Sequence, residues 1–162
     1  MNTEAYYKVM EIERAGETAK ALTMLEKLAQ NRDPLALLDL SARYYSIDGY
    51  AYPVEPIKPD HKKSKEFFFK AKERFEELTK EGSGEAMRML ASIYFGHWGP
   101  YIEKSYEKAE QYLLNAIEAK CFFAANDLAT FYQGSDLEKA KYYYKMAEKH
   151  NCRVIYNENL ET

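Results

Sequence analysis

Apolar side chains recur every three or four residues along most of the chain, which is the spacing of an amphipathic helix. Three segments place an alanine, then a leucine four residues on, then a tyrosine four residues further. They are Ala36, Leu40 and Tyr44; Ala86, Leu90 and Tyr94; and Ala124, Leu128 and Tyr132. This spacing sets the three side chains on one helical face, and the small alanine allows a neighbouring helix to approach closely.

A second pattern, with spacings of three and then four residues, follows each of these segments. Its members are Ser64, Phe67 and Ala71; Ala109, Tyr112 and Ala116; and Ala140, Tyr143 and Ala147, with a looser version at Ala21, Met24 and Leu28. A pair of helices therefore recurs, and the first alanines of successive pairs are 50 and then 38 residues apart. Helix pairs at such intervals are typical of solenoids. The sequence predicts an all-α fold, a right-handed α-solenoid of about four stacked antiparallel helix pairs.

Helix-ending glycines at Gly16, Gly82 and Gly134 help to set the boundaries. We expect eight helices, at 3–15, 18–31, 34–46, 60–81, 84–95, 105–119, 121–133 and 136–150. The whole chain, 1–162, is expected to form one solenoid domain. Its parts are an N-terminal capping helix pair at 1–33, repeats at 34–83, 84–120 and 121–150, and a C-terminal tail at 151–162.

The best-matched repeats are AMRMLASIYFG at 86–96 followed by EKAEQYLLNA at 107–116, and AANDLATFYQG at 124–134 followed by EKAKYYYKMA at 138–147. This stretch, within 84–150, resembles the Sel-one-like repeat family, a relative of the tetratricopeptide repeat. The resemblance extends over roughly 34–150. The unit at 34–83 departs from the pattern, because Ser46 replaces the glycine, Ser64 replaces the alanine and the connecting loop is long. The resemblance implies a scaffold or adaptor that recognises proteins, without catalysis.

Charge and hydropathy narrow the classes of partner. The 162 residues include 23 Lys and Arg against 26 Asp and Glu, a net charge of −3. This balance argues against nucleic-acid binding, which usually requires a basic surface. The N-terminus lacks the basic start and apolar stretch of a signal peptide, and no window approaches the length of a membrane span. We therefore expect a cytoplasmic protein with no membrane partner.

In tetratricopeptide relatives the first helix of each pair lines a concave groove, and the resemblance carries this expectation over. With the alanine–leucine–tyrosine face turned inward, the groove should present a mixture of aromatic and polar side chains. The candidates for protein binding are Tyr7, Glu11, Tyr45, Arg88, Ser92, Phe95, Asn126 and Thr130. For Tyr45 and Phe95, packing between repeats is an equally good interpretation.

Two loops that join the first helix of a pair to the second contain aromatic residues. The segment 47–59 contains Tyr50 and Tyr52, followed by three prolines. The segment 96–101 contains Trp98 and Tyr101. Tryptophan and tyrosine often dominate the energy of protein interfaces, so these four residues are further candidates. The alternative is that Trp98 and Tyr101 fold back to cover the core.

The sequence lacks the common motifs of catalysis, so we expect no metal site and no cofactor. His61, His97 and His150 lie in separate segments without an evident Asp or Ser partner. Cys121 and Cys152 form no metal motif and are expected to be reduced thiols. They stand at the same end of an antiparallel pair, which leaves a bridge under oxidation as the alternative.

The sequence favours a module that binds another protein. Its most concrete form is a bacterial immunity protein that neutralises a cognate toxin. One alternative is an adaptor or regulatory scaffold within a larger assembly. The other is a small enzyme without a known motif, whose site lies between the loops 47–59 and 96–104. The oligomeric state and the partner are not set by the sequence.

Overall fold

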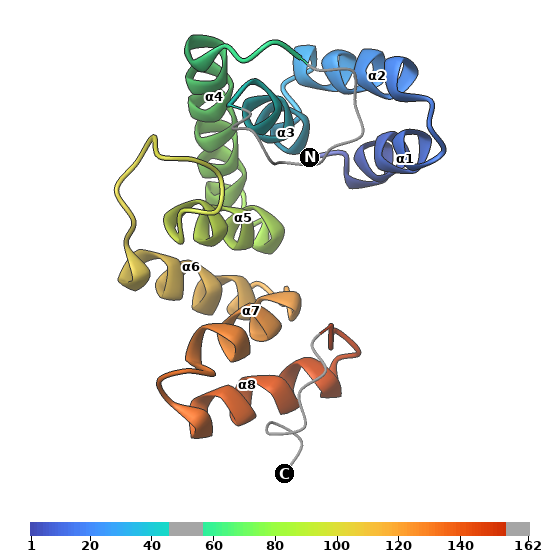
Figure 1. The fold of residues 1–162 in the computed structure, drawn as a ribbon. Helices are drawn as coiled ribbons and strands as arrows, with labels where there is room; N and C mark the ends of the chain where they lie inside the picture. Colours follow the sequence, from blue (N-terminus) through green and yellow to red (C-terminus); the bar gives the residue numbers. More distant parts are fainter. Residues whose placement is uncertain (46–56, 155–162) are drawn as a thin grey trace. The chain divides into compact units, whose positions relative to one another are not determined.

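The computed structural model describes residues 1–45 and 57–154, and all regular elements in this part of the chain are helices (Figure 1). They are α1 (Thr3–Arg14), α2 (Thr18–Gln30), α3 (Pro34–Tyr45), α4 (His61–Lys80), α5 (Gly84–Tyr94), α6 (Tyr106–Glu118), α7 (Phe123–Tyr132) and α8 (Leu137–Lys149). These helices confirm the all-α prediction. Each predicted helix end within the described residues falls within two residues of the observed one, and the end predicted at 46 lies outside them.

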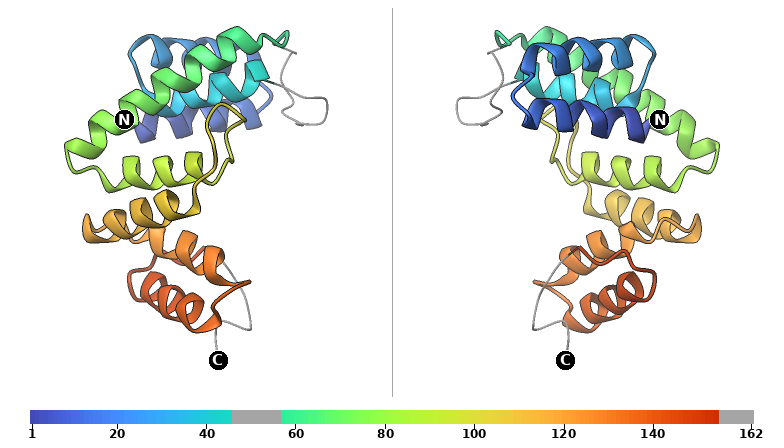
Figure 2. Two further views of the ribbon diagram at one scale, coloured as in Figure 1. Left: turned by 90° about the vertical axis from the view of Figure 1, so that its left-hand side faces the viewer. Right: turned by 90° about the vertical axis from the view of Figure 1, so that its right-hand side faces the viewer.

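The chain forms two compact units. Of the described residues, unit 1 contains 1–45, 57–77 and 98–102, and therefore holds α1 to α3 and most of α4. Unit 2 contains the described residues 78–97 and 103–154, and holds the last turn of α4 and α5 to α8. In unit 1, α2 packs on both α1 and α3; in unit 2, consecutive helices from α5 to α8 pack on each other (Figures 1 and 2). The assignment of 1–162 to one domain stays a prediction.

The second helix of every pair ends in the same turn. Its closing residue has a positive φ angle, and the next N–H donates to a carbonyl five residues back. The closing residues are Arg32, Gly82, Lys120 and Asn151, with φ of 58°, 87°, 63° and 54°. The hydrogen bonds run from Asp33 to Leu28, Ser83 to Leu78, Cys121 to Ala116 and Cys152 to Ala147. This is the Schellman motif, which satisfies carbonyls at a helix end. The same turn also closes α1 at Gly16 and α5 at Gly96.

Stacked rings join the two helices in each of the last three pairs. The ring pairs are Tyr44 with Phe67, Tyr94 with Tyr112 and Tyr132 with Tyr143, at centroid distances of 5.7, 5.7 and 5.9 Å. A lysine four residues before the second ring lies over each tyrosine, and these are Lys63, Lys108 and Lys139. The predicted pattern of small residues explains the close approach, because Ala71, Ala116 and Ala147 are fully buried.

Gly84, the first residue of α5, is buried against the turn between α6 and α7. A Cβ atom added at Gly84 would lie 2.6 Å from Cβ of Cys121 and 3.2 Å from the carbonyl oxygen of Ala116. Both neighbours are held by the backbone of unit 2, so neither can rotate away. Only glycine fits at this position.

We therefore expect Gly84→Ala to lower the free energy of unfolding by about 1–3 kcal/mol, the usual cost of overpacking. Urea denaturation followed by circular dichroism measures the change. Gly134→Ala is the matched control, because a Cβ at Gly134 meets nothing within 4 Å. If both variants unfold at the wild-type urea concentration, α5 does not approach the α6–α7 turn as closely as the structure shows.

Candidate protein-binding surfaces

A buried ion network fixes α1 on α3 in unit 1. The Arg43 guanidinium donates two hydrogen bonds to the Glu13 carboxylate, at 2.8 and 2.9 Å, and one of 2.7 Å to Asp39. All three side chains are at most 6% exposed. Burial lowers the pKa of Arg43, but the two carboxylates together raise it by more than burial lowers it. The net shift of the pKa is upward, so Arg43 stays charged. The Tyr6 hydroxyl also donates to Asp39, at 3.1 Å.

Arg43→Met should destabilise unit 1 by about 3–5 kcal/mol, because it leaves two buried carboxylates without their cation. Thermal and urea unfolding followed by circular dichroism measure the loss. Lys20→Met is the control, since Lys20 pairs with Glu17 on the surface, where an ion pair contributes about 0–1 kcal/mol. Equal losses in the two variants would contradict a structural role for the buried network.

The predicted contact residues of α1 lie on its outer face. Tyr7 is 62% exposed, and Glu11 is exposed one helical turn further along. The ion network holds the opposite face of the helix, where Glu13 is buried. Both predicted residues are therefore available to a partner on a helix whose position is fixed.

Tyr45 and Tyr101 lie together in unit 1, with ring centroids 5.8 Å apart. Tyr101 also packs on Phe68, and its hydroxyl donates to Oγ of Ser64 at 2.7 Å. Tyr45 further contacts the His61 ring. Tyr101 thus covers the core of unit 1, which is the alternative that the sequence left open for it. Where the pattern predicts alanine, the Ser64 hydroxyl accepts the bond from Tyr101 and donates to the Ser41 carbonyl at 2.7 Å.

The remaining loop candidates are placed as follows. Trp98 is half-buried and belongs to unit 1 with Tyr101. Tyr50 and Tyr52 lie outside the described residues. Their expected role in binding stays a prediction.

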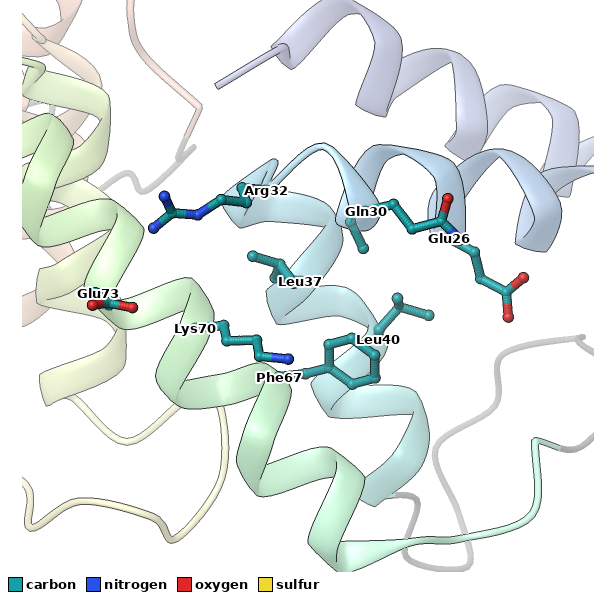
Figure 3. Close-up of a pocket in the computed structure, with 9 residues that line it drawn as sticks. Glu26, Gln30, Arg32, Leu37, Leu40, Phe67, Lys70 and Glu73 are labelled. Carbon is teal, nitrogen blue, oxygen red and sulfur yellow. The ribbon is translucent and has the colours of Figure 1, made fainter.

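A groove of about 700 Å³ opens on unit 1 between α2, α3 and α4 (Figure 3). Leu37, Leu40 and Phe67 form its apolar floor, and the charged residues around it come from α2, the α2–α3 turn and α4. These charged residues are Glu26, Arg32, Lys70 and Glu73. Sequence reasoning missed the groove, because it looked for a concave face on the first helices and not for a hollow beside a second helix.

Arg88 is engaged within unit 2. Its guanidinium donates to Asp127 of α7 at 2.6 Å, lies 3.7 Å from Glu85 and sits over the Phe123 ring. Burial lowers the pKa of Arg88, whereas Asp127 and Glu85 raise it, with a net upward shift. Arg88 therefore connects α5 to α7, and any partner would meet it as one half of an ion pair.

A second group on unit 2, which we call the aromatic surface, consists of Phe95, His97, Tyr106 and Phe131. Phe95 is its centre, with ring centroids 5.3 Å from Phe131, 5.6 Å from His97 and 6.1 Å from Tyr106. Tyr106 is 55% exposed, His97 is exposed, and the other two rings are half-buried. The sequence identified only Phe95, because alignment of the first helices places Gln133, and not Phe131, at the equivalent position.

Asn126 and Thr130, the candidates on α7, differ in exposure. Thr130 is exposed, and its hydroxyl donates to the Asn126 carbonyl at 3.0 Å. Asn126 is 2% exposed, and its side chain binds the backbone of Cys152 and Val154. The residue predicted to face a groove is thus covered by the chain's own C-terminal segment.

The comparisons with known proteins identify the fold. Over 93% of its length the chain superposes on the Sel1 repeat protein from Oxalobacter formigenes with a TM-score of 0.50 and 19% identity. The fold is that of Sel1-like repeat proteins. The chain spans 58% of the length of that protein. No family model matches the sequence, and no curated protein matches it.

A second solved structure is a protective antigen present in uropathogenic Escherichia coli strains, c5321, which displays an SLR fold. It is 17% identical, with a TM-score of 0.45, and the match covers 88% of this chain and 38% of the antigen.

Within the described residues, few side chains are arranged as in a catalytic centre. The nearest case is Ser92, whose Oγ lies 3.2 Å from Nδ1 of His97, a contact that sequence reasoning missed. The α5 terminus explains it, because the His97 N–H donates to the Ser92 carbonyl. In the described part of the chain no carboxylate hydrogen-bonds the His97 ring, and no group of three or more His, Cys, Asp or Glu could hold a metal ion. A membrane span would need a longer and more apolar helix than any found in residues 1–45 and 57–154.

Both cysteines are free thiols with partners of their own. The Cys121 thiol donates to Glu85 at 3.2 Å, and that of Cys152 to the His150 carbonyl at 3.3 Å. Burial and the Glu85 carboxylate raise the pKa of Cys121 to about 12, so the thiol stays protonated and unreactive at neutral pH. Bridge formation under oxidation stays a prediction.

Proposed function

We propose that this chain is a non-catalytic module that binds another protein, and in its most concrete form an immunity protein that neutralises a cognate toxin. The aromatic surface of unit 2 carries the proposal. Helices fixed by ring stacks and buried alanines present it, so the rings lose little conformational freedom when a partner covers them. Neutralisation by occlusion needs a rigid binding surface and no catalytic group.

The chemistry of this surface suits a protein partner. Tyr106 offers a large ring and a hydroxyl at the surface, and aromatic residues of this kind are enriched among interface hot spots. Arg88 and Asp127 add a paired charge on α5 and α7, and Phe131 belongs to α7 while Phe95 directly follows α5. A protein interface commonly joins such an aromatic centre to a polar rim.

Affinity capture of the tagged chain from the lysate of its own organism, followed by mass spectrometry, tests the proposal. The immunity form predicts one stoichiometric partner whose toxicity in a co-expression growth assay disappears when this chain is present. Recovery of several subunits of one assembly would instead support an adaptor. Absence of any partner would contradict the proposed function.

The partner's affinity should depend on Tyr106. We expect Tyr106→Ala to weaken the complex by more than about 2 kcal/mol, or roughly 30-fold in Kd, as measured by titration calorimetry. Tyr142→Ala is the matched control, because Tyr142 is similarly exposed on α8 and outside the aromatic surface. Equal affinities of the two variants would place the interface elsewhere. Circular dichroism confirms that each variant is folded.

A further inference from the structure

After α8 the described chain turns back over α7. Asn151 reverses the backbone at φ 54°, and residues 152–154 then run past the Asn126 side chain. The Asn126 amide nitrogen donates to the Cys152 carbonyl, and its amide oxygen accepts from the Val154 N–H at 3.2 Å. Since Asn126 is 2% exposed, this amide is a buried polar group whose hydrogen bonds are provided by the tail.

The two bonds follow the pattern of a neighbouring β-strand. A carbonyl and the N–H two residues later point to the same side of an extended chain, and a side-chain amide offers one donor and one acceptor to meet them. The contact therefore recognises backbone. The Val154 side chain contributes little to it, because Val154 is 72% exposed.

The residue between these two bonds is held by its charge. Arg153 pairs with Glu148 at 2.9 Å and lies over the Tyr144 ring, 5.6 Å from its centroid. Glu148 and Tyr144 both belong to α8, whereas Asn126 belongs to α7. These three residues, Asn126, Tyr144 and Glu148, form a surface that we call the tail seat.

The place of the tail seat in the repeat explains why it exists. Asn126 stands 38 residues after Arg88, the interval that separates the alanines of these two units. Arg88 reaches forward to Asp127 on the first helix of the next pair. The last pair of the described chain has no such helix after it, and residues 152–154 occupy the corresponding position.

We propose that the tail seat is a binding site for an extended peptide segment of a partner, and that residues 152–154 occupy it as a built-in competitor. The segment that fits has a free carbonyl and a free N–H two residues apart, with a basic residue between them for Glu148 and Tyr144. Such main-chain pairing is a common mode of peptide recognition. This site is distinct from the aromatic surface, and the inference does not depend on the proposed function.

Competition follows from the covalent link. A tethered segment meets its site at an effective concentration on the order of millimolar, so a free peptide binds the intact chain poorly. Removal or displacement of the tail opens the seat. A partner peptide therefore binds the tail seat only after residues 152–154 have left it.

The test compares the full chain with a chain shortened to end at Asn151. The probe is a fluorescein-labelled synthetic peptide with the sequence of residues 150–162 and Cys152→Ser, followed by fluorescence anisotropy. We expect the shortened chain to bind it at least 10-fold more tightly than the full chain does. A peptide N-methylated at Val154 should lose at least 10-fold in affinity, whereas a Val154→Thr peptide should bind within about 3-fold.

Variants of the shortened chain locate the binding. Asn126→Asp replaces the amide donor with an acceptor that repels the peptide carbonyl. This variant should no longer bind the labelled peptide. Asn115→Asp is the matched control, because Asn115 lies on α6 with its side chain bonded to Gln111. Absent binding to the folded shortened chain, equal binding to full and shortened chains, or full affinity of the N-methylated peptide would each overturn the proposal.

Hydrogen exchange of the full chain provides an independent test that does not require truncation. The Val154 amide should exchange at least 10-fold more slowly than in the free peptide, and Asn126→Asp should abolish this protection. Exchange at the free-peptide rate in the wild-type chain would show that the seat is empty and would overturn the proposal.

Discussion

A tyrosine ring from the first helix lies nearly parallel to a ring from the second helix in three successive pairs, and the rest of each pair is arranged around this contact. The interplanar angles are 14°, 14° and 10°, so the same geometry recurs in both units. Stacking at this distance needs closely spaced helices, which the buried alanines permit. The lysine over each tyrosine shields the outer side of the stack, and the Schellman turn then sends the chain into the next pair.

Much of this arrangement could be predicted, because helical spacing determines which side chains share a face. The tyrosines at 44, 94 and 132 and the rings at 67, 112 and 143 were all identified from spacing. The lysines four residues before these rings were also visible in the sequence, but their role depends on a ring from another helix. The turns at Arg32 and Lys120 could not be predicted in this way, because arginine and lysine have no preference for the left-handed region. Asn151 is a residue type that often replaces glycine at a helix end.

The candidate surfaces were less predictable, because spacing determines a face but not what covers it. Asn126 and Thr130 share a helix, yet the C-terminal segment buries the first and leaves the second exposed. The network of Glu13, Asp39 and Arg43 escaped notice for a related reason. Charged residues on a helix usually face solvent, and the partners of Arg43 are separated by 26 residues in the sequence. Asp39 and Arg43 lie one helical turn apart on α3, whereas only the fold brings Glu13 to them.

A double-mutant cycle on Tyr94 and Tyr112 tests the central claim most directly. The measurement is the free energy of unfolding in urea for the wild type, Tyr94→Leu, Tyr112→Leu and the double variant. If the stacked rings hold the helix pair together, the coupling energy should be about 0.5–1.5 kcal/mol. Additive losses, with coupling within about 0.3 kcal/mol of zero, would contradict the account, because the two rings would then stabilise their helices independently.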